Sequence, residues 1–369
     1  MSSDFPAILQ CSGLRSWAQI LGRSKAESRP IPIPRAAGRR VLVTGAGGFI
    51  GSEMARRFAA SGAQRVVLLE IAEPALFDLD REMAARGNGE RTVAVLGDVC
   101  DRSLLAALFE EHRPEIVLHA AALKHVPLME RNPRAAVETN ALGTWRLAQV
   151  ATEFGVARMI LVSTDKAVAP HSIMGASKRI AEAAMLGHPG SAAVRLVNVI
   201  GSPGSVAPLF AEQIAQGGPV TVTHPEARRF FLTLDEVAAL LAEAVETETA
   251  HGVLVPDSGE PVVIADLARR MMAASGRDVS VAFTAPRPGD KLEEALVAAE
   301  EYCEGPATAG LYRVASRTGF DFARRVQSLE SAVAERDLPL MLRLVEEMVP
   351  DYRPSAVLRN AVSATASAR

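Results

Sequence analysis

The sequence predicts an α/β protein whose core is a doubly wound parallel sheet. From Arg40 onward, short runs rich in β-branched residues alternate with segments of helical length over about 160 residues. The runs are apolar almost throughout, which is typical of strands buried on both faces of a parallel sheet. The segments between them are rich in alanine and other helix formers. This alternation implies right-handed βαβ units, with a different α/β fold as the alternative.

Six strands and the helices between them can be placed in order. The expected strands are RVLVT (from Arg40), RVVLLE (from Arg65), TVAVL (from Thr92), EIVLHA (from Glu115), MILVST (from Met159) and AAVRLVNV (from Ala192). The expected helices include EMARRFAASG and SLLAALFEEH. In the long helical stretch RNPRAAVETNALGTWRLAQVATEFG, Asn132 can cap a helix and Pro133 suits its first position.

The pattern changes after Asn198, where loops are more frequent and elements are shorter. A helix is expected in TLDEVAALLAEAVE, with a capping box between Thr233 and Glu236. Further along, the sequence predicts a helix in PVVIADLARRMMAASG and a strand, a turn and a helix in VSVAFTAPRPGDKLEEAL. The last part predicts one or two helices in VQSLESAVAERDLPLMLRLVEEMVPDY and a frayed tail in NAVSATASAR.

Four regions follow from this reading. We expect an N-terminal arm and linker (1–38), the doubly wound domain (39–197) to which segments around 229–255 return, a smaller mixed α/β domain (198–322), and C-terminal helices with a tail (323–369). The N-terminus lacks the basic-then-apolar order of a signal peptide. It is interpreted as a weakly amphipathic helix, or as a mobile arm or packing segment, and a peripheral membrane contact stays open. The stretch SKAESRPIPIPRAAGRR predicts a linker ending near Gly38.

Composition excludes several classes of function. The chain has 369 residues, is 49% hydrophobic and carries a formal net charge of -3. Nothing in this balance favours binding to nucleic acid or to an anionic membrane. The three cysteines are scattered without disulfide or metal-ligand spacing, which favours the reducing cytosol and predicts no metal site. No apolar run reaches the roughly 18–20 residues that span a bilayer.

A glycine motif indicates a dinucleotide site. Gly45, Gly48 and Gly51 directly follow the first expected strand and open a helix, which is the context that pyrophosphate binding requires. Glu70 ends the next strand, where a carboxylate accepts hydrogen bonds from ribose hydroxyls and repels a 2′-phosphate. This favours NAD over NADP. Asp98 follows the third strand at the expected adenine edge, and the small side chains of HAAALK would let a cofactor approach the backbone.

The candidate catalytic groups lie at the end of the fifth expected strand. Ser163, Thr164, Asp165 and Lys166 place hydroxyls, a carboxyl group and an amine where ligands bind in a doubly wound fold. One spacing departs from a familiar pattern, because the Tyr-x-x-x-Lys of many nicotinamide-dependent enzymes is here MGASK, from Met174 to Lys178. Lys178 would face the same site one helical turn on. A thioether cannot exchange a proton, so the acid–base chemistry must come from elsewhere.

The glycine motif together with STDKAVAPHSIMGASKR resembles the extended short-chain dehydrogenase/reductases, which have a Rossmann domain. More narrowly, it resembles the UDP-N-acetylglucosamine 4,6-dehydratases of bacterial polysaccharide and glycan biosynthesis, O-antigen included. The likeness continues through HAAALKHVPLMERNPRAAVETNALGT, VRLVNVIGSPGSVAPLFAEQIAQGGPVTVTHPEARRFFLT and RPGDKLEEAL, over roughly Arg40 to Leu296. Many relatives carry N-terminal membrane helices. We expect a soluble short form, although QILGR resembles the stretch before their catalytic domain.

This resemblance implies a reaction. NAD takes a hydride from sugar C4, a base removes the C5 proton, an acid protonates the departing C6 hydroxyl, and the hydride returns to C6. Asp165 is the candidate acid and needs a raised pKa, which burial would supply. Lys166 is the candidate base and needs a lowered pKa, from desolvation and a second cation such as Lys124 or Lys178. Lys178 would also bind the nicotinamide ribose. Thr164 or a lysine-linked water would take the O4 proton, and Met174 indicates a subgroup.

The resemblance also implies where the ligands lie. The expected cofactor contacts are Thr44, Gly45, Gly48, Phe49, Ile50, Gly51, Glu70, Asp98, Val99, Ala120, Ala121, Ala122, Asn140, Ser163 and Lys178. The expected substrate contacts are Lys124, His125, Asn198, Ser205, Val206, Leu209, Thr221, Arg229 and Arg287. Arginine suits the pyrophosphate because its planar fork donates two hydrogen bonds. His119 is interpreted as a core residue, and His171 and His224 as loop residues.

The sequence therefore predicts a cytoplasmic UDP-N-acetylhexosamine 4,6-dehydratase that retains the C5 configuration and forms a homo-oligomer. Two enzyme alternatives stay open, a C5-inverting dehydratase and a C4 epimerase. Relatives that invert C5 generally keep the tyrosine, and an epimerase would need it. The non-enzyme alternative is an NAD-binding sensor that has lost catalysis, which would not need Thr164, Asp165, Lys166 and Lys178 together.

Overall fold

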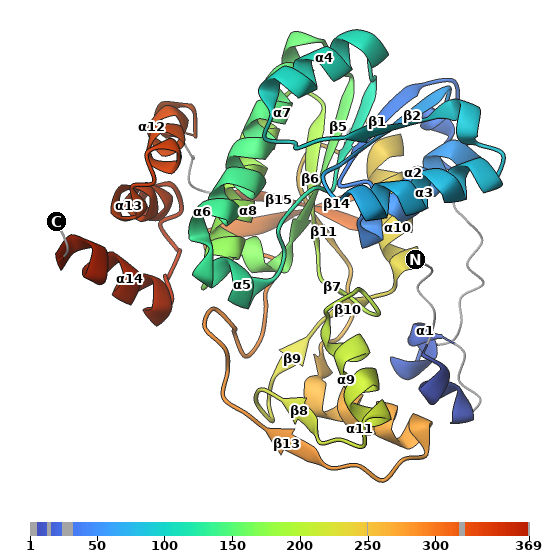
Figure 1. The fold of residues 1–369 in the computed structure, drawn as a ribbon, viewed down its shortest axis with the longest axis vertical. Helices are drawn as coiled ribbons and strands as arrows, with labels where there is room; N and C mark the ends of the chain where they lie inside the picture. Colours follow the sequence, from blue (N-terminus) through green and yellow to red (C-terminus); the bar gives the residue numbers. More distant parts are fainter. Residues whose placement is uncertain (1–5, 13–15, 24–31, 249, 317–321, 368–369) are drawn as a thin grey trace.

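The computed structural model describes residues 6–12, 16–23, 32–248, 250–316 and 322–367. Its centre is a nine-stranded sheet in the order β14-β15-β11-β6-β5-β4-β1-β2-β3, drawn edge-on behind the helices in Figure 1. The strands are β1 (Arg40–Thr44), β2 (Arg65–Glu70), β3 (Thr92–Leu96), β4 (Ile116–His119), β5 (Arg158–Thr164), β6 (Ser191–Leu196), β11 (Gly252–Pro256), β14 (Glu301–Thr308) and β15 (Leu311–Ser316).

The six expected strands are confirmed, and all of them pair in parallel. Three later strands complete the sheet: β11 pairs with β6 in parallel, β15 pairs with β11 in antiparallel fashion, and β14 pairs with β15 in antiparallel fashion. The strand order reverses between β1 and β4. In a doubly wound sheet such a reversal opens a crevice at the carboxyl ends of the strands, where ligands bind.

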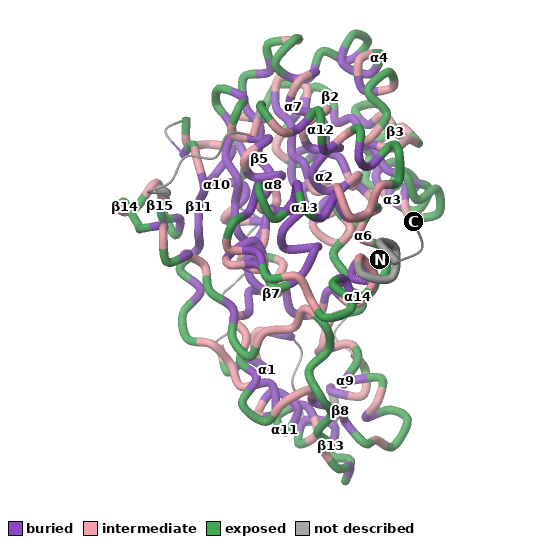
Figure 2. Tube along the Cα trace, turned by 90° about the vertical axis from the view of Figure 1, so that its left-hand side faces the viewer, coloured by how far each residue is buried: buried purple, intermediate pink, exposed green. Residues whose placement is uncertain are grey.

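Each central strand packs on both faces. In β1, Val41 and Val43 belong to one hydrophobic cluster and Leu42 to another, as the two-residue period of a strand requires. Figure 2 shows the resulting band of buried residues through β5, α8 and α10. One face is covered by α2 (Phe49–Ala60), α3 (Glu73–Ala85) and α10 (Leu234–Glu246), and the other by α4 (Arg102–His112), α7 (Gly143–Glu153) and α8 (Ile173–Leu186).

A smaller group of elements lies beyond the carboxyl edge of the sheet, at the lower end of Figure 1. It consists of β7 (Asn198–Val199), α9 (Val206–Ala215), β8 (Val220–Val222), β9 (Arg228–Arg229), β10 (Phe231–Leu232), β12 (Val262–Val263), α11 (Ile264–Ser275) and β13 (Val281–Phe283). The capping box of α10 is confirmed between Thr233 and Glu236. The domain boundaries at residues 38, 197 and 322 stay predictions.

The N-terminal arm packs on this smaller group. It contains a 3-10 turn, η1 (Ala7–Ser12), and the short helix α1 (Trp17–Ile20). Leu9, Trp17 and Ile20 are buried in a cluster with residues of α9 and α11. Most of the expected linker lies outside the described residues, which resume at Pro32 and include η2 (Pro34–Ala36). No described helix combines the length and apolar character needed to cross a membrane.

The helix after the fourth strand differs from its prediction. It is divided into α5 (Val126–Arg131), α6 (Pro133–Ala136), a π-helical segment at Val137–Leu142 and then α7. Pro133 does occupy the first turn of α6, but the Asn132 side chain caps nothing. Its amide donates to the Leu128 carbonyl oxygen instead. Asn132 is therefore the N-cap residue of α6 by position, but the predicted side-chain cap does not form.

Two predictions near the C-terminus are also wrong. KLEEAL forms no helix, because its carbonyl groups are engaged from outside: the Arg229 guanidinium binds the Lys291 and Leu292 carbonyls, and the Arg228 amide also binds Leu292. The tail expected to fray forms α14 (Ala356–Ser367). Two helices precede it, in agreement with the expectation of one or two helices. They are α12 (Phe322–Ala334) and α13 (Leu338–Met348), which bury apolar side chains against α8.

Candidate active site

The glycine loop after β1 has no room for side chains. Gly45 adopts a φ of 65°, and a Cβ on it would lie 2.6 Å from the Ala121 amide nitrogen. A Cβ on Gly51 would collide with the Gly45 carbonyl oxygen, so these two residues fix how closely α2 approaches the strand. Gly48 is the N-cap of α2, whose first turn holds Phe49, Ile50 and Gly51. The free amide groups of this helix end can bind a pyrophosphate.

Glu70 lies beside this loop at the end of β2. Its carboxylate accepts hydrogen bonds from the amides of Gly47 (3.0 Å), Ile71 (2.9 Å) and Ala72 (3.0 Å). Glu70 is therefore held against the glycine loop, at the distance from the helix end that a ribose would occupy. The glycine loop, which leaves the backbone accessible, and the adjacent Glu70 carboxylate are together suited to bind NAD.

The neighbouring strand ends are tightly organised. His119 is fully buried, with its ring nitrogens 2.6 Å from Thr44 Oγ1 and 2.8 Å from Thr144 Oγ1, and burial together with the Lys178 charge lowers its pKa to about 3. It is a neutral core residue, as expected. Ala120, Ala121 and Ala122 follow it along the cradle. Asp98 accepts from the Cys100 amide beside buried Val99.

Asn140 is the polar residue of the π-helical segment that is fully buried. Its side chain accepts from the Leu123 amide (2.8 Å) and donates to the Leu123 carbonyl (3.0 Å) and to Ser177 Oγ (3.0 Å). Asn140 thus joins the chain after β4 to α8, and it contributes to the shape of the cofactor cleft rather than to its charge.

Thr164, Asp165 and Lys166 come together at the end of β5, where η5 (Asp165–Ala167) begins. Thr164 Oγ1 donates to Asp165 Oδ1 (2.9 Å), and Lys166 Nζ donates to the same oxygen (2.8 Å). Asp165 is fully buried, and within the described part of the chain its Oδ2 atom has no hydrogen-bond partner. A buried carboxyl oxygen without a partner is costly, so this atom is available to a ligand.

The environment of Lys166 differs from the prediction. Burial works to lower the pKa of Lys166, but the carboxylates of Asp165 and Glu294 more than offset it, so that this pKa lies above its ordinary value. The expected lowering is therefore wrong for the free protein. The cation that opposes the carboxylates is Arg229 rather than Lys124 or Lys178. Lys166 Nζ also lies 3.4 Å from Asn198 Oδ1 on β7, which links the pair to the smaller group of elements.

The first turn of α8 lies directly against this pair. Gly175 leaves no space for a Cβ, which would meet the Lys166 backbone. The Ser172 hydroxyl caps the helix by accepting from the Gly175 amide (3.2 Å). Met174 is buried within the apolar cluster under the C-terminal helices, so it supplies packing and no proton. Lys178 is buried one turn later, and burial lowers its pKa to about 8.

The two expected pyrophosphate arginines have protein partners. Arg229 donates to the Lys291 carbonyl (2.8 Å) and the Leu292 carbonyl (2.9 Å). Arg287 is largely exposed and binds Asp290 through Nε (2.9 Å). Lys291 in turn reaches the Val168 carbonyl (2.6 Å), just past η5. The RPGDK loop is thereby tied to the catalytic strand end, and a nucleotide would have to exchange these contacts.

The other expected substrate residues surround α9. Ser205 is its N-cap, and its buried hydroxyl has no partner in the described part of the chain. Val206 begins the helix and Leu209 is exposed one turn on, while Thr221 on β8 accepts from the Gln213 side chain (2.7 Å). Lys124 Nζ donates to the Pro203 carbonyl (2.9 Å), and burial lowers its pKa. His125 is the N-cap of α5, and its ring faces Gly204.

Sequence reasoning missed one charged residue of this site. Glu294 is buried, lies 3.4 Å from Lys291 Nζ and raises the pKa of Lys166. The block RPGDKLEEAL carried the signal, but only Arg287 was taken from it as a site residue. His171 and His224 are loop residues, as expected. The described residues contain no group of side chains that could hold a metal ion.

A second buried charge cluster lies on the same elements, deeper in the protein. Arg195 on β6 is fully buried and binds Glu182 and Glu301, with both carboxylate oxygens of each within 2.7–2.9 Å of its guanidinium. Ser163 Oγ on β5 donates to Glu182 (2.6 Å), and Arg179 binds both carboxylates. Ser163 therefore supports the network behind the site, although it was expected to contact the cofactor.

Comparisons with known proteins agree with this geometry. The family described as "Polysaccharide biosynthesis protein" matches residues 41–316. The capsular polysaccharide biosynthesis protein CapD of Staphylococcus aureus is 41% identical over 305 residues, which cover 80% of this chain and 51% of CapD. The probable polysaccharide biosynthesis protein EpsC of Bacillus subtilis is 42% identical, over 71% of this chain and 46% of EpsC. The chain spans about half the length of these relatives.

Other similar proteins cover more of their own length. A UDP-glucose 4-epimerase of Rickettsia prowazekii is 32% identical, over 75% of this chain and 82% of the epimerase. Pen from Bacillus thuringiensis has a similar crystal structure, with a TM-score of 0.66 and 28% identity over 71% of this chain and 83% of Pen. DesIV, a dTDP-glucose 4,6-dehydratase of Streptomyces venezuelae solved with NAD bound, gives a TM-score of 0.63 and 26% identity over 70% of this chain and 88% of DesIV.

Proposed function

Because the chain belongs to the polysaccharide biosynthesis protein family of extended short-chain dehydrogenase/reductases, we propose that it is a nucleotide-sugar 4,6-dehydratase acting in surface polysaccharide synthesis. The substrate proposed is a UDP-N-acetylhexosamine, UDP-N-acetylglucosamine first, and the product keeps its C5 configuration. The observation that carries the proposal is the buried Asp165–Lys166 pair, with Thr164 on the same carboxylate oxygen.

The cofactor proposed is NAD, held by the glycine loop and by Glu70. The closely packed backbone at Gly45 and Gly51 and the N-terminus of α2, which has no side-chain cap, support this choice. NAD supplies the hydride acceptor and donor that dehydration needs. The burial of Lys178 suits a position beside the nicotinamide ribose. The Lys178 pKa of about 8 leaves the amine mostly protonated at neutral pH.

Asp165 and Lys166 serve as acid and base at C6 and C5. In the free protein the raised pKa of Lys166 keeps the amine protonated. A proton transferred along the 2.8 Å contact from Nζ to Oδ1 would convert the pair into a neutral carboxylic acid and a neutral amine. The amine then takes the C5 proton, and the acid gives its proton to the departing C6 hydroxyl, which leaves as water. As the sugar is reduced at C6, the Lys166 ammonium returns a proton to C5 from the same face, which keeps the C5 configuration, and the proton from O4 restores the pair to its starting charge. The Arg229 charge favours the transfer from Nζ to Oδ1, because it lowers the pKa of Lys166.

Thr164 is the proposed group at O4. Met174 has no exchangeable proton, and Thr164 Oγ1 already donates to Asp165 (2.9 Å). The Thr164 hydroxyl, which is hydrogen-bonded to Asp165, can pass a proton from O4 of the sugar toward the Asp165–Lys166 pair. The proposal therefore needs no tyrosine. It also disfavours C4 epimerisation, although a UDP-glucose 4-epimerase is among the relatives.

The test is a product analysis by proton NMR. Purified protein incubated with UDP-N-acetylglucosamine should form the UDP-4-keto-6-deoxy sugar without net reduction of NAD. Unchanged substrate after long incubation with added NAD would contradict the dehydratase proposal, and UDP-N-acetylgalactosamine as product would instead favour the epimerase. A parallel reaction in D₂O reports the C5 stereochemistry. UDP-glucose and UDP-N-acetylgalactosamine as alternative substrates give the specificity.

A further inference from the structure

We propose that the N-terminal arm is part of the nucleotide-sugar site, with Trp17 as a positioning residue for the loop that joins Asn198 to Ser205. This inference rests on the proposed function, because it concerns binding of the UDP group. Trp17 lies in α1 and is buried in a cluster with Ile200, Ala207 and Phe210. The arm lies outside the residues that match the family, so nothing in that match accounts for it.

The loop is held from one side by the indole ring. Gly201 has a φ of 80°, and a Cβ on it would lie 2.8 Å from Trp17 Cδ1, so the ring edge rests directly on the Gly201 backbone. Only glycine permits this approach and this conformation together. Ile200 next to it donates its amide to the Leu232 carbonyl on β10 (2.9 Å).

The same loop is held from the other side by candidate substrate residues. A Cβ on Gly204 would lie 2.6 Å from His125 Cε1, and Lys124 Nζ donates to the Pro203 carbonyl (2.9 Å). Trp17 therefore contacts the loop at Gly201, and the chain after β4 contacts it at Pro203 and Gly204. One end of the loop is Asn198, which contacts Lys166, and the other end is Ser205, whose buried hydroxyl has no partner in the described part of the chain.

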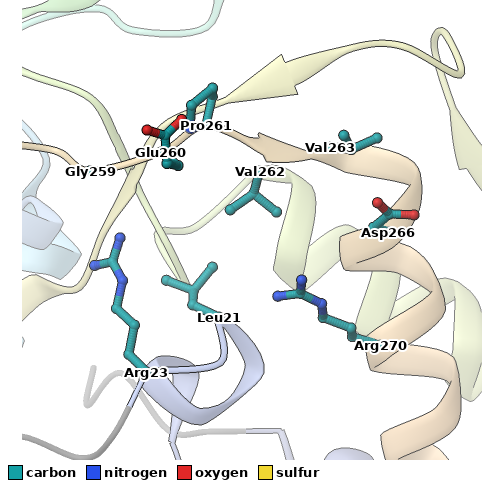
Figure 3. A pocket seen from close by; sticks show the side chains of 9 residues that line it. All are labelled: Leu21, Arg23, Gly259, Glu260, Pro261, Val262, Val263, Asp266 and Arg270. Atoms are coloured by element: carbon teal, nitrogen blue, oxygen red, sulfur yellow. The ribbon is translucent and has the colours of Figure 1, made fainter.

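A second contact of the arm points the same way. Arg23 binds Glu236 (2.9 Å) and donates to the Phe231 carbonyl (2.8 Å), on the strand that pairs with β7. Leu21 and Arg23 also face Val262 and Arg270 across a pocket of about 410 Å³ (Figure 3). Val262 pairs with Arg229, one of the expected pyrophosphate ligands. The arm thus supports both the Asn198–Ser205 loop and the strand next to Arg229.

The test measures UDP affinity separately from turnover. Trp17→Ala should raise the Kd for UDP, measured by calorimetry, and should raise the KM for the UDP-sugar by about ten-fold. An effect of this size is expected for a residue that acts without touching the ligand. We expect kcat and the bound NAD content to stay within about two-fold. Trp17→Phe should restore most of the affinity, because a phenyl ring still covers Gly201. Trp145→Phe changes the second tryptophan, which packs against Phe322 of α12, and should leave the UDP affinity unchanged.

Gly201→Ala tests the same contact without altering the arm, and it remains informative should Trp17→Ala fail to fold. Its control is Gly276→Ala, at a φ of 67° with no atom within 4 Å of the added Cβ, which introduces similar backbone strain without a ring. Gly201→Ala should weaken UDP binding more than Gly276→Ala does. The loss should shrink in the Trp17→Ala background, because the methyl group then has space.

Unchanged UDP affinity in both Trp17→Ala and Gly201→Ala would overturn the inference. So would a fall in kcat with KM constant, because Trp17 would then act on chemistry or folding and not on binding. A wild-type protein that binds no UDP would overturn the proposed function, and this inference with it. Wild-type binding with no effect in either variant would overturn the inference alone.

Discussion

Two buried charge clusters, one in η5 at the end of β5 and one formed by residues of β6, α8 and β14, differ in how completely their hydrogen bonds are satisfied. Arg195, Glu182 and Glu301 form a closed network in which every carboxylate oxygen is bound. The Asp165–Lys166 pair leaves one buried carboxylate oxygen without a partner in the described part of the chain. Closed networks fix a structure, whereas a buried polar atom left open is where a ligand can gain a hydrogen bond. The two clusters therefore predict opposite responses to substitution.

The largest expected effect is on turnover at the open pair. Asp165→Asn and Lys166→Ala should each lower kcat by roughly 10²–10⁴-fold, because each removes one proton-transfer group. Thermal unfolding of Asp165→Asn should change less than that of Arg195→Met, since the amide oxygen still accepts from Thr164 and Lys166 and the Lys166 side chain is partly exposed. NAD content and UDP affinity measured on the same preparations are the controls. Retained turnover in either variant would end the role assigned to that residue.

The closed network should respond in stability. Arg195→Met leaves Glu182 and Glu301 buried without their main partner, which costs about 3–5 kcal/mol of unfolding free energy. Urea unfolding followed by circular dichroism measures this loss. Arg269→Met on an exposed pair is the matched control and should cost no more than about 1 kcal/mol. A stability loss as small as that of the control would show that the two clusters do not differ in this way.

Thr164→Val should have an intermediate effect, confined to chemistry. The substitution keeps the shape of the side chain but removes the hydroxyl that donates to Asp165. If Thr164 takes the O4 proton in place of a tyrosine, kcat should fall by about 10²-fold with KM nearly constant. Thr164→Ser should restore most of the rate. A rate within two-fold of wild type in Thr164→Val would leave a water linked to Lys178 as the proton acceptor.

The smallest expected effect is the acid sensitivity of the closed network. Burial would raise the pKa of Glu301, but the Arg195 and Arg179 guanidinium groups more than offset it and lower the pKa to about 2. A lowered carboxylate pKa stabilises the fold above its ordinary value of 4.5, and this stabilisation disappears as the pH falls from 4.5 toward 2. Melting temperatures over that range should fall more steeply for wild type than for Glu301→Gln. Parallel curves would contradict the shift.

The sequence predicted the parallel sheet well, because a strand buried on both faces needs an apolar run and little else. The Asp165–Lys166 pair was also predictable, since adjacent residues at a strand end must lie near each other. What the sequence could not give was the direction of the Lys166 pKa shift. That direction depends on Glu294, which is distant in sequence and lies in a segment where arginine side chains, rather than helical amides, bind the carbonyl groups.

The same reason explains why the sequence predicted an N-terminal arm but not the surface on which it packs. Leu9, Trp17 and Ile20 do not form a pattern that specifies a partner, because their partners lie on α9 and α11. From the sequence alone, Gly201 and Gly204 are only loop residues. Their roles become visible when the contacts of Gly201 with Trp17 and of Gly204 with His125 are known. Local rules predict elements, whereas the packing between distant segments decides which loop residues matter for binding.

The position of the arm has a consequence for biosynthesis. A ribosome makes Trp17 well before α11, which begins at Ile264 and completes the cluster that buries the indole. Until then, the apolar side chains of the arm have no native surface to cover. They are open during that interval to chaperones and to other nascent chains, which bind exposed apolar segments. The arm is thus translated long before the helix that completes its native contacts.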